Sequence, residues 1–283
     1  MKLNLFLLPA LLLVLIFVSE SRSQSSEAGI MFGTVTYKGE LNKSLFTPRF
    51  LRPSVGIHYR KNMNNHWAHR LGASYGVIEA DDASAEDDYQ KRRNLSFRSP
   101  IIDFHYLLEF NFFPYQIANP KSSFSPFLFV GINGFIFDPQ AELNGEWVRL
   151  QPLGTEGQGT NAYPDRKKYN RFQIGIPFGG GVKFKLSRRF GMSVEAGVRR
   201  LYTDYLDDVS TTYADKAVLL AASGEEAVLL SDRSVDGQSL DNTDRQRGNA
   251  ADRDWYMFTG FTLNYSLSKR YNDNCTPFKG KLR

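Results

Sequence analysis

Apolar and polar residues alternate with a period of two along much of this chain. In residues 51–60 the odd positions are mostly apolar, as at Val55 and Ile57. The even positions are polar or small, as at Arg52 and His58. Such alternation indicates a β-strand with one apolar and one polar face. The pattern recurs in residues 67–77, 102–112, 172–186, 192–198 and 257–267, and less cleanly near residues 29–37 and 124–137. These segments predict about eight strands of about ten residues or more, the length of tilted membrane strands.

The polar face of these strands distinguishes a membrane barrel from a soluble sandwich. In a sandwich this face would meet water and be rich in Lys, Glu and Thr, whereas here it is rich in Gly and small residues with isolated charges. That composition suits a narrow lumen, and the glycine run at residues 179–181 predicts a bend or a close backbone approach. Aromatic residues near strand ends are typical of interfacial girdles: Tyr59, Trp67, Phe112 and Trp255. We therefore expect an all-β fold, an eight-stranded antiparallel transmembrane β-barrel.

The connections between the expected strands differ in length. Residues 61–65 and 187–189 are short, and residues 114–123 are moderate. The other four connections are long: residues 38–50, 79–99, 138–171 and 204–254. Short turns on one rim and long loops on the other are typical of outer-membrane barrels, whose short rim lies in the periplasm. We therefore expect long external loops, periplasmic termini and a small helix within residues 214–230.

The first residues have the pattern of a secretory signal. Lys2 precedes an apolar run at residues 5–18, and small residues follow at Ser21 and Ser23. A membrane anchor is the alternative, but the run is shorter than the about 20 residues that span a bilayer. We expect an outer-membrane protein with three parts: a signal peptide at residues 1–23, the barrel at residues 24–268 and a periplasmic C-terminal tail at residues 269–283.

Composition narrows the function classes further. The mean hydropathy of −0.37 alone would suggest a soluble protein, but aromatic residues make up 14% of the chain. Modest hydropathy with many aromatic residues suits a barrel whose lipid-facing residues alternate with polar ones. The formal charge of +5 is spread along the chain with no basic block, so we expect no nucleic acid as a partner. Outer-membrane lipid is the partner that the expected barrel implies. A single cysteine excludes an internal disulfide framework and a multi-cysteine metal site.

The polar strand faces place charged residues inside the expected barrel. The basic and histidine positions are Arg52, His58, Arg60, Arg70, His105, Lys183, Lys185 and Arg199, and the acidic ones are Asp103, Glu109 and Glu195. Eight strands enclose a lumen that side chains can fill, and buried charges need partners there. A plug of salt-bridged side chains is the favoured interpretation. A selective pore, or a catalytic pair such as Asp103 with His105, is the alternative.

Other candidate sites are weak. His66 and His69 lie at a strand start and point to opposite faces, which disfavours a shared metal ion. The Gly-rich residues 154–159 lack the Lys-Ser/Thr of a P-loop, so a flexible external loop is the better interpretation. Acidic residues in the segment 79–88 could bind a divalent cation, but such loops are usually solvated. We therefore predict no catalytic residue, no cofactor, no metal site and no small-molecule substrate.

Several segments, spread over most of the mature chain, form an ordered series of motifs. They are EWVRLQPLGTEGQG at residues 146–159, IPFGGGVK at residues 176–183, TDYLDDVSTTY at residues 203–213, Arg247-Gly248, residues 254–256, and Cys275 followed by Pro277-Phe278. This series resembles the PorG-like barrels of the Bacteroidota type IX secretion system. Residues 217–250 form a long insert that departs from the family pattern.

The resemblance implies a non-enzymatic role in protein secretion. It implies an outer-membrane partner of the periplasmic ring that is built from the PorK lipoprotein and PorN. That machinery exports folded cargo and, in gliding motility, adhesins. The alternative function is a small outer-membrane transport or surface-binding barrel, which would use its lumen or its outer loops.

The expected periplasmic tail contains the only cysteine of the chain, Cys275. A leftover cysteine in an exported protein indicates either a free thiol or an intermolecular disulfide. Together with the resemblance, it makes a disulfide with a ring lipoprotein a reasonable hypothesis. Basic residues in the tail would help it meet an acidic partner surface. The hypothetical partner-contact residues are Cys275, Lys269, Arg270, Lys279 and Lys281.

Overall fold

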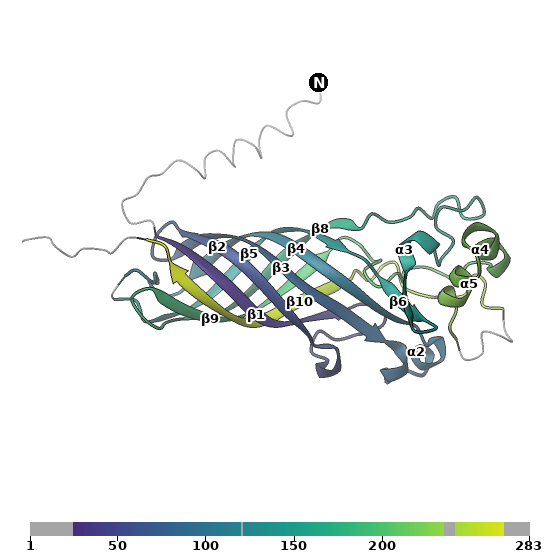
Figure 1. Ribbon diagram of the computed structural model, residues 1–283, viewed down its shortest axis with the longest axis horizontal. Helices are drawn as coiled ribbons and strands as arrows, with labels where there is room; N and C mark the ends of the chain where they lie inside the picture. The colour runs from purple at the N-terminus through teal and green to yellow at the C-terminus, as the bar shows by residue number, and fades with distance from the viewer. Residues whose placement is uncertain (1–24, 120, 235–240, 269–283) are drawn as a thin grey trace, which may run out of the picture.

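The alternating segments form eight antiparallel strands that close into an elongated barrel (Figure 1). The computed structural model describes residues 25–119, 121–234 and 241–268. The barrel strands are β1 (Ser26–Lys38), β2 (Arg52–Asn62), β3 (Trp67–Asp81), β4 (Ser96–Asn111), β5 (Phe124–Phe137), β8 (Phe172–Lys185), β9 (Phe190–Leu201) and β10 (Trp255–Ser266). Their order is β3-β2-β1-β10-β9-β8-β5-β4, and pairing of β3 with β4 closes the ring. The predicted fold class is therefore confirmed.

The four long connections form a layer over one end of the barrel, which we call the cap (Figure 1). The cap comprises the described parts of residues 39–51, 82–95, 138–171 and 202–254. Its elements are η1 (Pro48–Phe50), η2 (Asp82–Ser84), α2 (Asp88–Arg93), the hairpin β6 (Gln140–Leu143) with β7 (Glu146–Arg149), α3 (Leu150–Leu153), α4 (Lys216–Ser223) and α5 (Glu225–Ser231). The helix expected within residues 214–230 is thus present as two short helices, α4 and α5. Among the described residues, no helix is both long and apolar enough to cross a membrane.

The opposite end of the barrel has only short and moderate connections, which we call the short rim. It contains the described parts of residues 61–66, 112–123 and 186–189, which include the end of β2, together with the outer ends of β1 and β10. The predicted asymmetry of loop lengths is therefore confirmed. The expected signal peptide at residues 1–23 and tail at residues 269–283 lie outside the described residues.

The predicted facing of the strands is confirmed by side-chain exposure. Ile57, Leu71 and Ile132 are 62–66% exposed on the outside of the barrel, whereas His58 is only 8% exposed. Neighbouring side chains of a strand point to opposite faces, so this contrast follows from the period of two. The result is an apolar outer belt of the kind that faces lipid. Of the expected girdle residues, Tyr59, Trp67 and Phe112 are exposed and Trp255 is partly exposed.

The interior differs from the expected polar lumen in the half nearest the cap. There, apolar and aromatic side chains point inward and form one buried cluster, which includes Val35, Tyr37, Phe135 and Phe137. These residues lie on β1 and β5, the two strands whose alternation is less clean. On β5 both faces are apolar near the cap, because Ile136 is exposed on the outer wall and Phe135 and Phe137 pack into this core. On β1 the inward face changes from Gly29 near the short rim to Val35 and Tyr37 near the cap, whereas the outer face changes from apolar residues to threonines.

At the glycine run of β8, the backbone of β9 approaches closely, as expected. A Cβ atom at Gly179 would lie 2.1 Å from the carbonyl oxygen of Ala196 on β9. It would also lie 2.7 Å from the ring of Phe129, which points into the lumen. Glycine is therefore required at Gly179, because any larger residue would push β9 or Phe129 away.

Candidate functional site

The half of the lumen nearest the short rim is filled by a network of ion pairs centred on Glu109 of β4. The Glu109 carboxylate accepts hydrogen bonds from Arg60 Nε at 2.8 Å and Lys183 Nζ at 2.5 Å, and it lies 2.9 Å from Arg70 Nε. Arg60 also pairs with Glu27 at 2.8 Å, and Arg70 pairs with Glu195 at 2.7 Å. Three cations thus share one fully buried carboxylate, and two further carboxylates complete the balance.

A second level of this network lies closer to the apolar core. Asp103 accepts hydrogen bonds from His105 Nδ1 at 2.7 Å, Asn133 Nδ2 at 2.7 Å and the Tyr256 hydroxyl at 2.6 Å. Arg199 lies 3.7 Å away. The adjoining cavity has a volume of about 10 Å³, enough for about one water molecule. Because Asp103 is saturated with donors and no room remains for a substrate, the geometry favours a structural role for the Asp103–His105 pair over catalysis.

The charged residues expected in the lumen separate into two groups. Nine of them are buried there: His58, Arg60, Arg70, Asp103, His105, Glu109, Lys183, Glu195 and Arg199. The other two lie at the ends of the barrel and are partly exposed. Arg52 pairs with Glu79 near the cap, and Lys185 donates to the carbonyl of Asn119 at the short rim. A salt-bridged plug therefore occupies the described lumen.

The Gly-rich residues 154–159 form the centre of the cap, so the expected flexible loop is wrong. Glu156 is fully buried and accepts hydrogen bonds from the backbone amides of Ser210 at 2.9 Å and Thr211 at 3.0 Å. Arg247 Nη1 donates to the same carboxylate at 3.0 Å. Gly154, with φ of +62°, and Gly157 and Gly159, with φ of +79°, allow the reversals of the chain that bury Glu156.

Arg247 joins this centre to the next acidic residue. Its guanidinium donates to the Asp208 carbonyl at 2.6 Å, and the Asp208 carboxylate accepts from Tyr169 at 2.7 Å and from Thr155. Burial raises the pKa of Asp208 to about 7, although Arg247 acts in the opposite direction. Residues far apart in the sequence, at 155–156, 208–211 and 247, therefore form one packed unit.

A second group of acidic residues, which we call the acidic cluster, lies where the cap meets the barrel. It comprises Glu40, Asp204 and Asp254, all buried, and each offers one oxygen such that the three oxygens lie within 4.8 Å of one another. Asp207 lies nearby, where its carboxylate accepts from the Tyr37 hydroxyl and the Val209 amide. Several buried carboxylates this close together are unusual, because burying a charge without an oppositely charged partner costs free energy.

The carboxyl groups of the acidic cluster shift one another toward the protonated form. Burial, and then the neighbouring Asp207 and Asp204, raise the pKa of Glu40 to about 9. Burial also raises the pKa of Asp204 to about 8 and that of Asp207 to about 6. The Ser210 hydroxyl and the charge of Arg253 lower the pKa of Asp204, but they do not cancel this shift. The acidic cluster thus has an excess of negative charge whenever its carboxyl groups are ionised.

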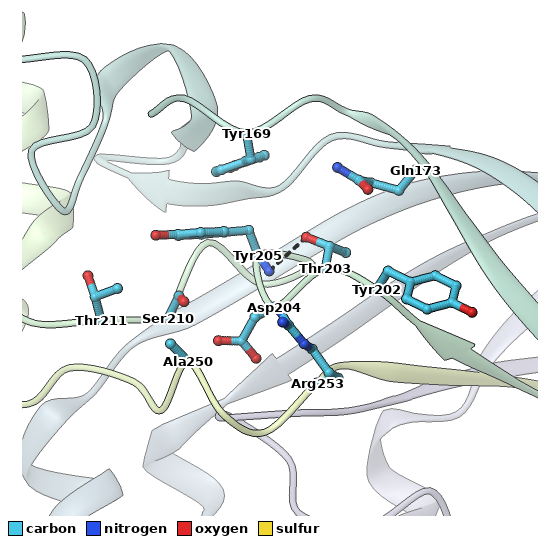
Figure 2. A pocket seen from close by; sticks show the side chains of 10 residues that line it. All are labelled: Tyr169, Gln173, Tyr202, Thr203, Asp204, Tyr205, Ser210, Thr211, Ala250 and Arg253. Carbon is cyan, nitrogen blue, oxygen red and sulfur yellow. Dashed lines mark hydrogen bonds between the residues drawn. The ribbon is translucent and has the colours of Figure 1, made fainter. Parts of the chain in front are cut away.

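An open cavity of about 440 Å³ adjoins the acidic cluster, and Asp204 lines its wall (Figure 2). The rings of Tyr169 and Tyr205 lie parallel on one side of it, with centroids 4.9 Å apart and an interplanar angle of 15°. Arg253 lies on the opposite side, beside Asp204 (Figure 2). The cavity therefore connects the acidic cluster to the surroundings of the cap.

The acidic cluster has no signature in the local sequence because its members lie far apart along the chain. Their common feature is position: Glu40 follows β1, Asp204 follows β9 and Asp254 precedes β10. These three strands are neighbours in the closed barrel, since β10 pairs with both β9 and β1. The three carboxylates could therefore be predicted to meet only from the closure of the barrel, which makes β1, β10 and β9 neighbours.

The other candidates from the sequence stay apart. His66 binds the Asn111 carbonyl, and His69 binds the Tyr106 hydroxyl. The acidic residues of the segment 79–88 are also used separately, since Asp82 is buried against Arg93 and Asp87 caps α2. The expected partner-contact residues, among them Cys275, lie outside the described residues.

Comparisons with known proteins give one family and several solved structures. The family described as "Domain of unknown function (DUF6089)" matches residues 6–152, more than half of the chain. No curated protein sequence matches. Among solved structures, a major outer membrane protein of Thermus thermophilus has 10% identity and a TM-score of 0.41, and the match covers 87% of this chain and 100% of that chain.

Two further structures are similar at the same level. The attachment invasion locus protein Ail of Yersinia pestis has 10% identity and a TM-score of 0.39, with 86% of this chain and 98% of that chain covered. Neisserial surface protein A has 9% identity and a TM-score of 0.37, with 86% and 96% covered. Likenesses of this size do not extend to function.

Proposed function

The chain belongs to the family described as "Domain of unknown function (DUF6089)", and we propose that it is a non-enzymatic outer-membrane barrel of the type IX secretion system. In this role it is the outer-membrane partner of the periplasmic PorK/PorN ring. The short rim faces the periplasm and the cap faces outward. Secretion of folded cargo is then a task of the machinery, and the barrel supplies an attachment point in the membrane.

The observation that carries this proposal is the filled lumen. Glu109 holds Arg60, Arg70 and Lys183 across the interior, and the neighbouring cavity admits about one water molecule. An eight-stranded barrel filled in this way has no path for a solute. Contacts with other molecules then fall to the outer wall, the cap and the short rim, which favours an assembly role over transport.

The short rim carries charge that suits a periplasmic protein partner. Exposed basic side chains lie on three of its segments: Lys61, Lys121, Arg188 and Arg189. Electrostatic complementarity raises the rate and specificity of association with an acidic surface. The basic residues of the expected tail, such as Lys279 and Lys281, would add to this surface if the tail lies in the periplasm.

The sequence segments that resemble the PorG-like barrels also support the proposal. The segment 146–159 contributes Glu156, the segment 203–213 contributes Asp208, and Arg247 joins them in the centre of the cap. The resemblance thus includes a set of residues that pack together in space. Residues that form one folded unit are a more specific likeness than residues scattered over a barrel wall.

Crosslinking in intact cells tests the ring partnership. A photoreactive amino acid at Lys121 or Arg188 on the short rim is expected to give adducts with PorK-like or PorN-like proteins, identified by mass spectrometry. The same probe at Asp165, an exposed position in the cap, is the matched control and is expected to give none. Adducts from Asp165 alone would contradict the proposed orientation and partner.

The hypothesis of a disulfide at Cys275 has its own test. Non-reducing gels of whole cells are expected to show a higher-mass adduct that disappears with dithiothreitol, and Cys275→Ser is expected to abolish it. If the wild-type thiol instead reacts fully with maleimide in intact envelopes, the disulfide is excluded. Truncation after Ser268 then tests whether the tail binds the ring without a covalent bond.

A surface-binding barrel is the second candidate function, and the cap cavity is the observation that favours it. Its stacked tyrosines, Tyr169 and Tyr205, offer a flat aromatic wall with Arg253 opposite (Figure 2). Aromatic walls with a few polar groups are typical of small-ligand sites. Purification that recovers only lipopolysaccharide, with no ring protein, would favour this function over the first.

A further inference from the structure

The ends of three neighbouring strands bring Glu40, Asp204 and Asp254 into one buried group at the base of the cap. We propose that these three residues form a binding site for a hard divalent cation, with calcium as the best match. This inference goes beyond the proposed function and does not depend on it. It rests on which carboxylate oxygens have partners, on the surrounding charges and on access from the cap cavity.

Two carboxylate oxygens of the acidic cluster accept hydrogen bonds from backbone amides, and the other four, which we call free, do not. Glu40 Oε1 accepts from the Asn249 amide at 3.3 Å, and Asp254 Oδ2 accepts from the Leu206 amide at 2.8 Å. The other oxygen of each group, Glu40 Oε2 and Asp254 Oδ1, is buried and has no hydrogen-bond partner. Neither oxygen of Asp204 has a partner of hydrogen-bond geometry among the described residues, although the Ser210 hydroxyl lies close by. Such a set of oriented carboxylates with free oxygens is what a metal site requires.

The free oxygens are an exception that needs a physical cause. Each of the three residues is at most 3% exposed, and the free oxygen atoms themselves are buried. Buried polar atoms in proteins are nearly always satisfied, and four orphaned carboxylate oxygens in one place are therefore unusual. A bound cation would satisfy all of them at once.

Protein cations balance only part of the charge of the acidic cluster, since exposed Arg253 beside Asp204 is the one arginine that acts on this carboxylate among the groups that shift its pKa. Within the described residues, no ion pair joins Glu40, Asp204 or Asp254 to a Lys or Arg side chain. Two buried guanidinium groups of the cap pair with other carboxylates: Arg93 with Asp82, and Arg247 with Glu156. One arginine cannot balance three carboxylates, so the remaining negative charge of the acidic cluster must be balanced by a bound cation or by protons.

The ligand chemistry points to calcium among the common cations. All ligand atoms are carboxylate oxygens, which hard cations prefer over the nitrogen and sulfur ligands typical of zinc. The three offered oxygens lie within 4.8 Å of one another, which is twice the Ca–O distance of about 2.4 Å. This spacing meets the condition that any two ligands of one calcium ion lie at most about two Ca–O distances apart, and flexible coordination allows water to complete the shell. Magnesium demands closer and more regular ligands.

The cap cavity offers a path for the ion and its water. Asp204 belongs both to the acidic cluster and to the wall of the cavity (Figure 2). The cavity volume of about 440 Å³ leaves room for several waters beside this carboxylate. A cation bound here would tie the ends of β1, β9 and β10 to the connection 202–254 and so hold the cap on the barrel.

Calcium binding by the folded full-length mature chain tests this proposal. The protein is stripped with a chelator in detergent and titrated with calcium or magnesium in a mildly alkaline buffer, where proton competition is reduced. Calorimetry is expected to show one saturable calcium site and weaker magnesium binding. Terbium, a calcium substitute, is expected to show luminescence sensitised by nearby Tyr205, and calcium is expected to quench it by displacement.

Variants separate the site from other acidic surfaces. Asp204→Asn removes the charge of the cluster carboxylate that lines the cavity and is expected to weaken calcium binding by about 10- to 100-fold or more. Glu40→Gln is expected to act in the same direction. The matched control is Asp165→Asn, which alters an exposed carboxylate in the same cap and is expected to bind calcium like the wild type.

The remaining outcomes would overturn the proposal. If the stripped wild type binds neither calcium nor terbium, the carboxyl groups are balanced by protons instead. If Asp204→Asn and Glu40→Gln bind calcium as the wild type does, the ion lies elsewhere. Heat-modified migration on gels checks that each variant retains its barrel, and Glu40→Gln keeps the test decisive if Asp204→Asn fails to fold.

Discussion

The lumen and the cap both bury charged side chains, but they balance these charges in different ways. In the described lumen, four carboxylates meet four Lys or Arg side chains: Glu27, Asp103, Glu109 and Glu195 with Arg60, Arg70, Lys183 and Arg199. In the acidic cluster of the cap, Glu40, Asp204 and Asp254 form no ion pair with a Lys or Arg of the described chain, and only exposed Arg253 lies beside Asp204. The lumen is therefore a closed electrostatic unit, whereas the cap has unsatisfied charge that calls for an ion or protons.

This difference in charge balance indicates different roles for the lumen and the cap. Paired charges in a narrow barrel fix the arrangement of the strands, since loss of either partner leaves the other buried and unpaired. Unpaired carboxylates do not stabilise a fold by themselves, and strained or unsatisfied groups concentrate at functional positions. The barrel interior therefore stabilises the fold, and the cap is the region where a ligand is expected.

The largest expected effect is the loss of the central carboxylate of the lumen. Glu109→Gln leaves Arg60, Arg70 and Lys183 facing a neutral amide, so we expect the free energy of unfolding to fall by about 3–5 kcal/mol. Urea unfolding in lipid vesicles, followed by tryptophan fluorescence, measures it. Glu146→Gln, an exposed change in the cap, is the control and is expected to have little effect. Equal stability of both variants would mean that the lumen network is not a structural unit.

The next effect concerns the outer wall of the barrel. Val55 is 42% exposed on the lipid-facing side of β2, so Val55→Arg places a charge against hydrocarbon. We expect a loss of about 2–4 kcal/mol if the residue lies near the midplane. Asp88→Lys, on exposed α2 in the cap, is the control and is expected to be tolerated. Similar costs for both variants would show that the wall does not face lipid.

The barrel was largely predictable from the sequence because each strand encodes its own two faces. His58 and Val55 on β2 lie on opposite faces by alternation alone, whichever strand pairs with them. On β5, Phe135 and Ile136 are both apolar, and only the fold shows that the first packs into a core under the cap. Local alternation therefore predicts which residues point inward, but not what fills the space they point into.

The structure of the cap was not predictable, because its side chains contact residues that are distant in the sequence. Glu156 lies among glycines and polar residues, a composition typical of solvated loops, yet it is buried by the 208–211 segment and Arg247. Glu40, Asp204 and Asp254 likewise come together only when the barrel closes. Periodicity carries no information about contacts of this kind, and only the helices α4 and α5 had a local signal.

A smaller effect is expected from the centre of the cap, and it should not reach the barrel. Glu156→Gln removes the charge that binds Arg247 and weakens the bonds to the amides of Ser210 and Thr211. We expect the opening free energy of the cap to fall by about 1–3 kcal/mol, since hydrogen bonds to charged groups contribute about this much. Hydrogen exchange is expected to speed up in the segment 203–213 only. Glu142→Gln, exposed on β6, is the control, and faster exchange throughout the barrel strands would contradict the separation of the two regions.

The smallest effect is expected where the two regions meet, at the ion pair of Arg52 with Glu79. This pair has the same chemistry as the lumen pairs, but its side chains are 40% and 31% exposed, whereas those of Arg60 and Glu109 are 1% and 0% exposed. Water and salt screen such a pair, and long side chains lose entropy when they hold it, so we expect a coupling energy of about 0–1 kcal/mol. A double-mutant cycle of Arg52→Gln and Glu79→Gln in urea unfolding measures it, and added salt is expected to reduce it further. A coupling as large as that measured for Arg60 and Glu109 would mean that pairing itself, and not burial, makes the lumen charges essential to the fold.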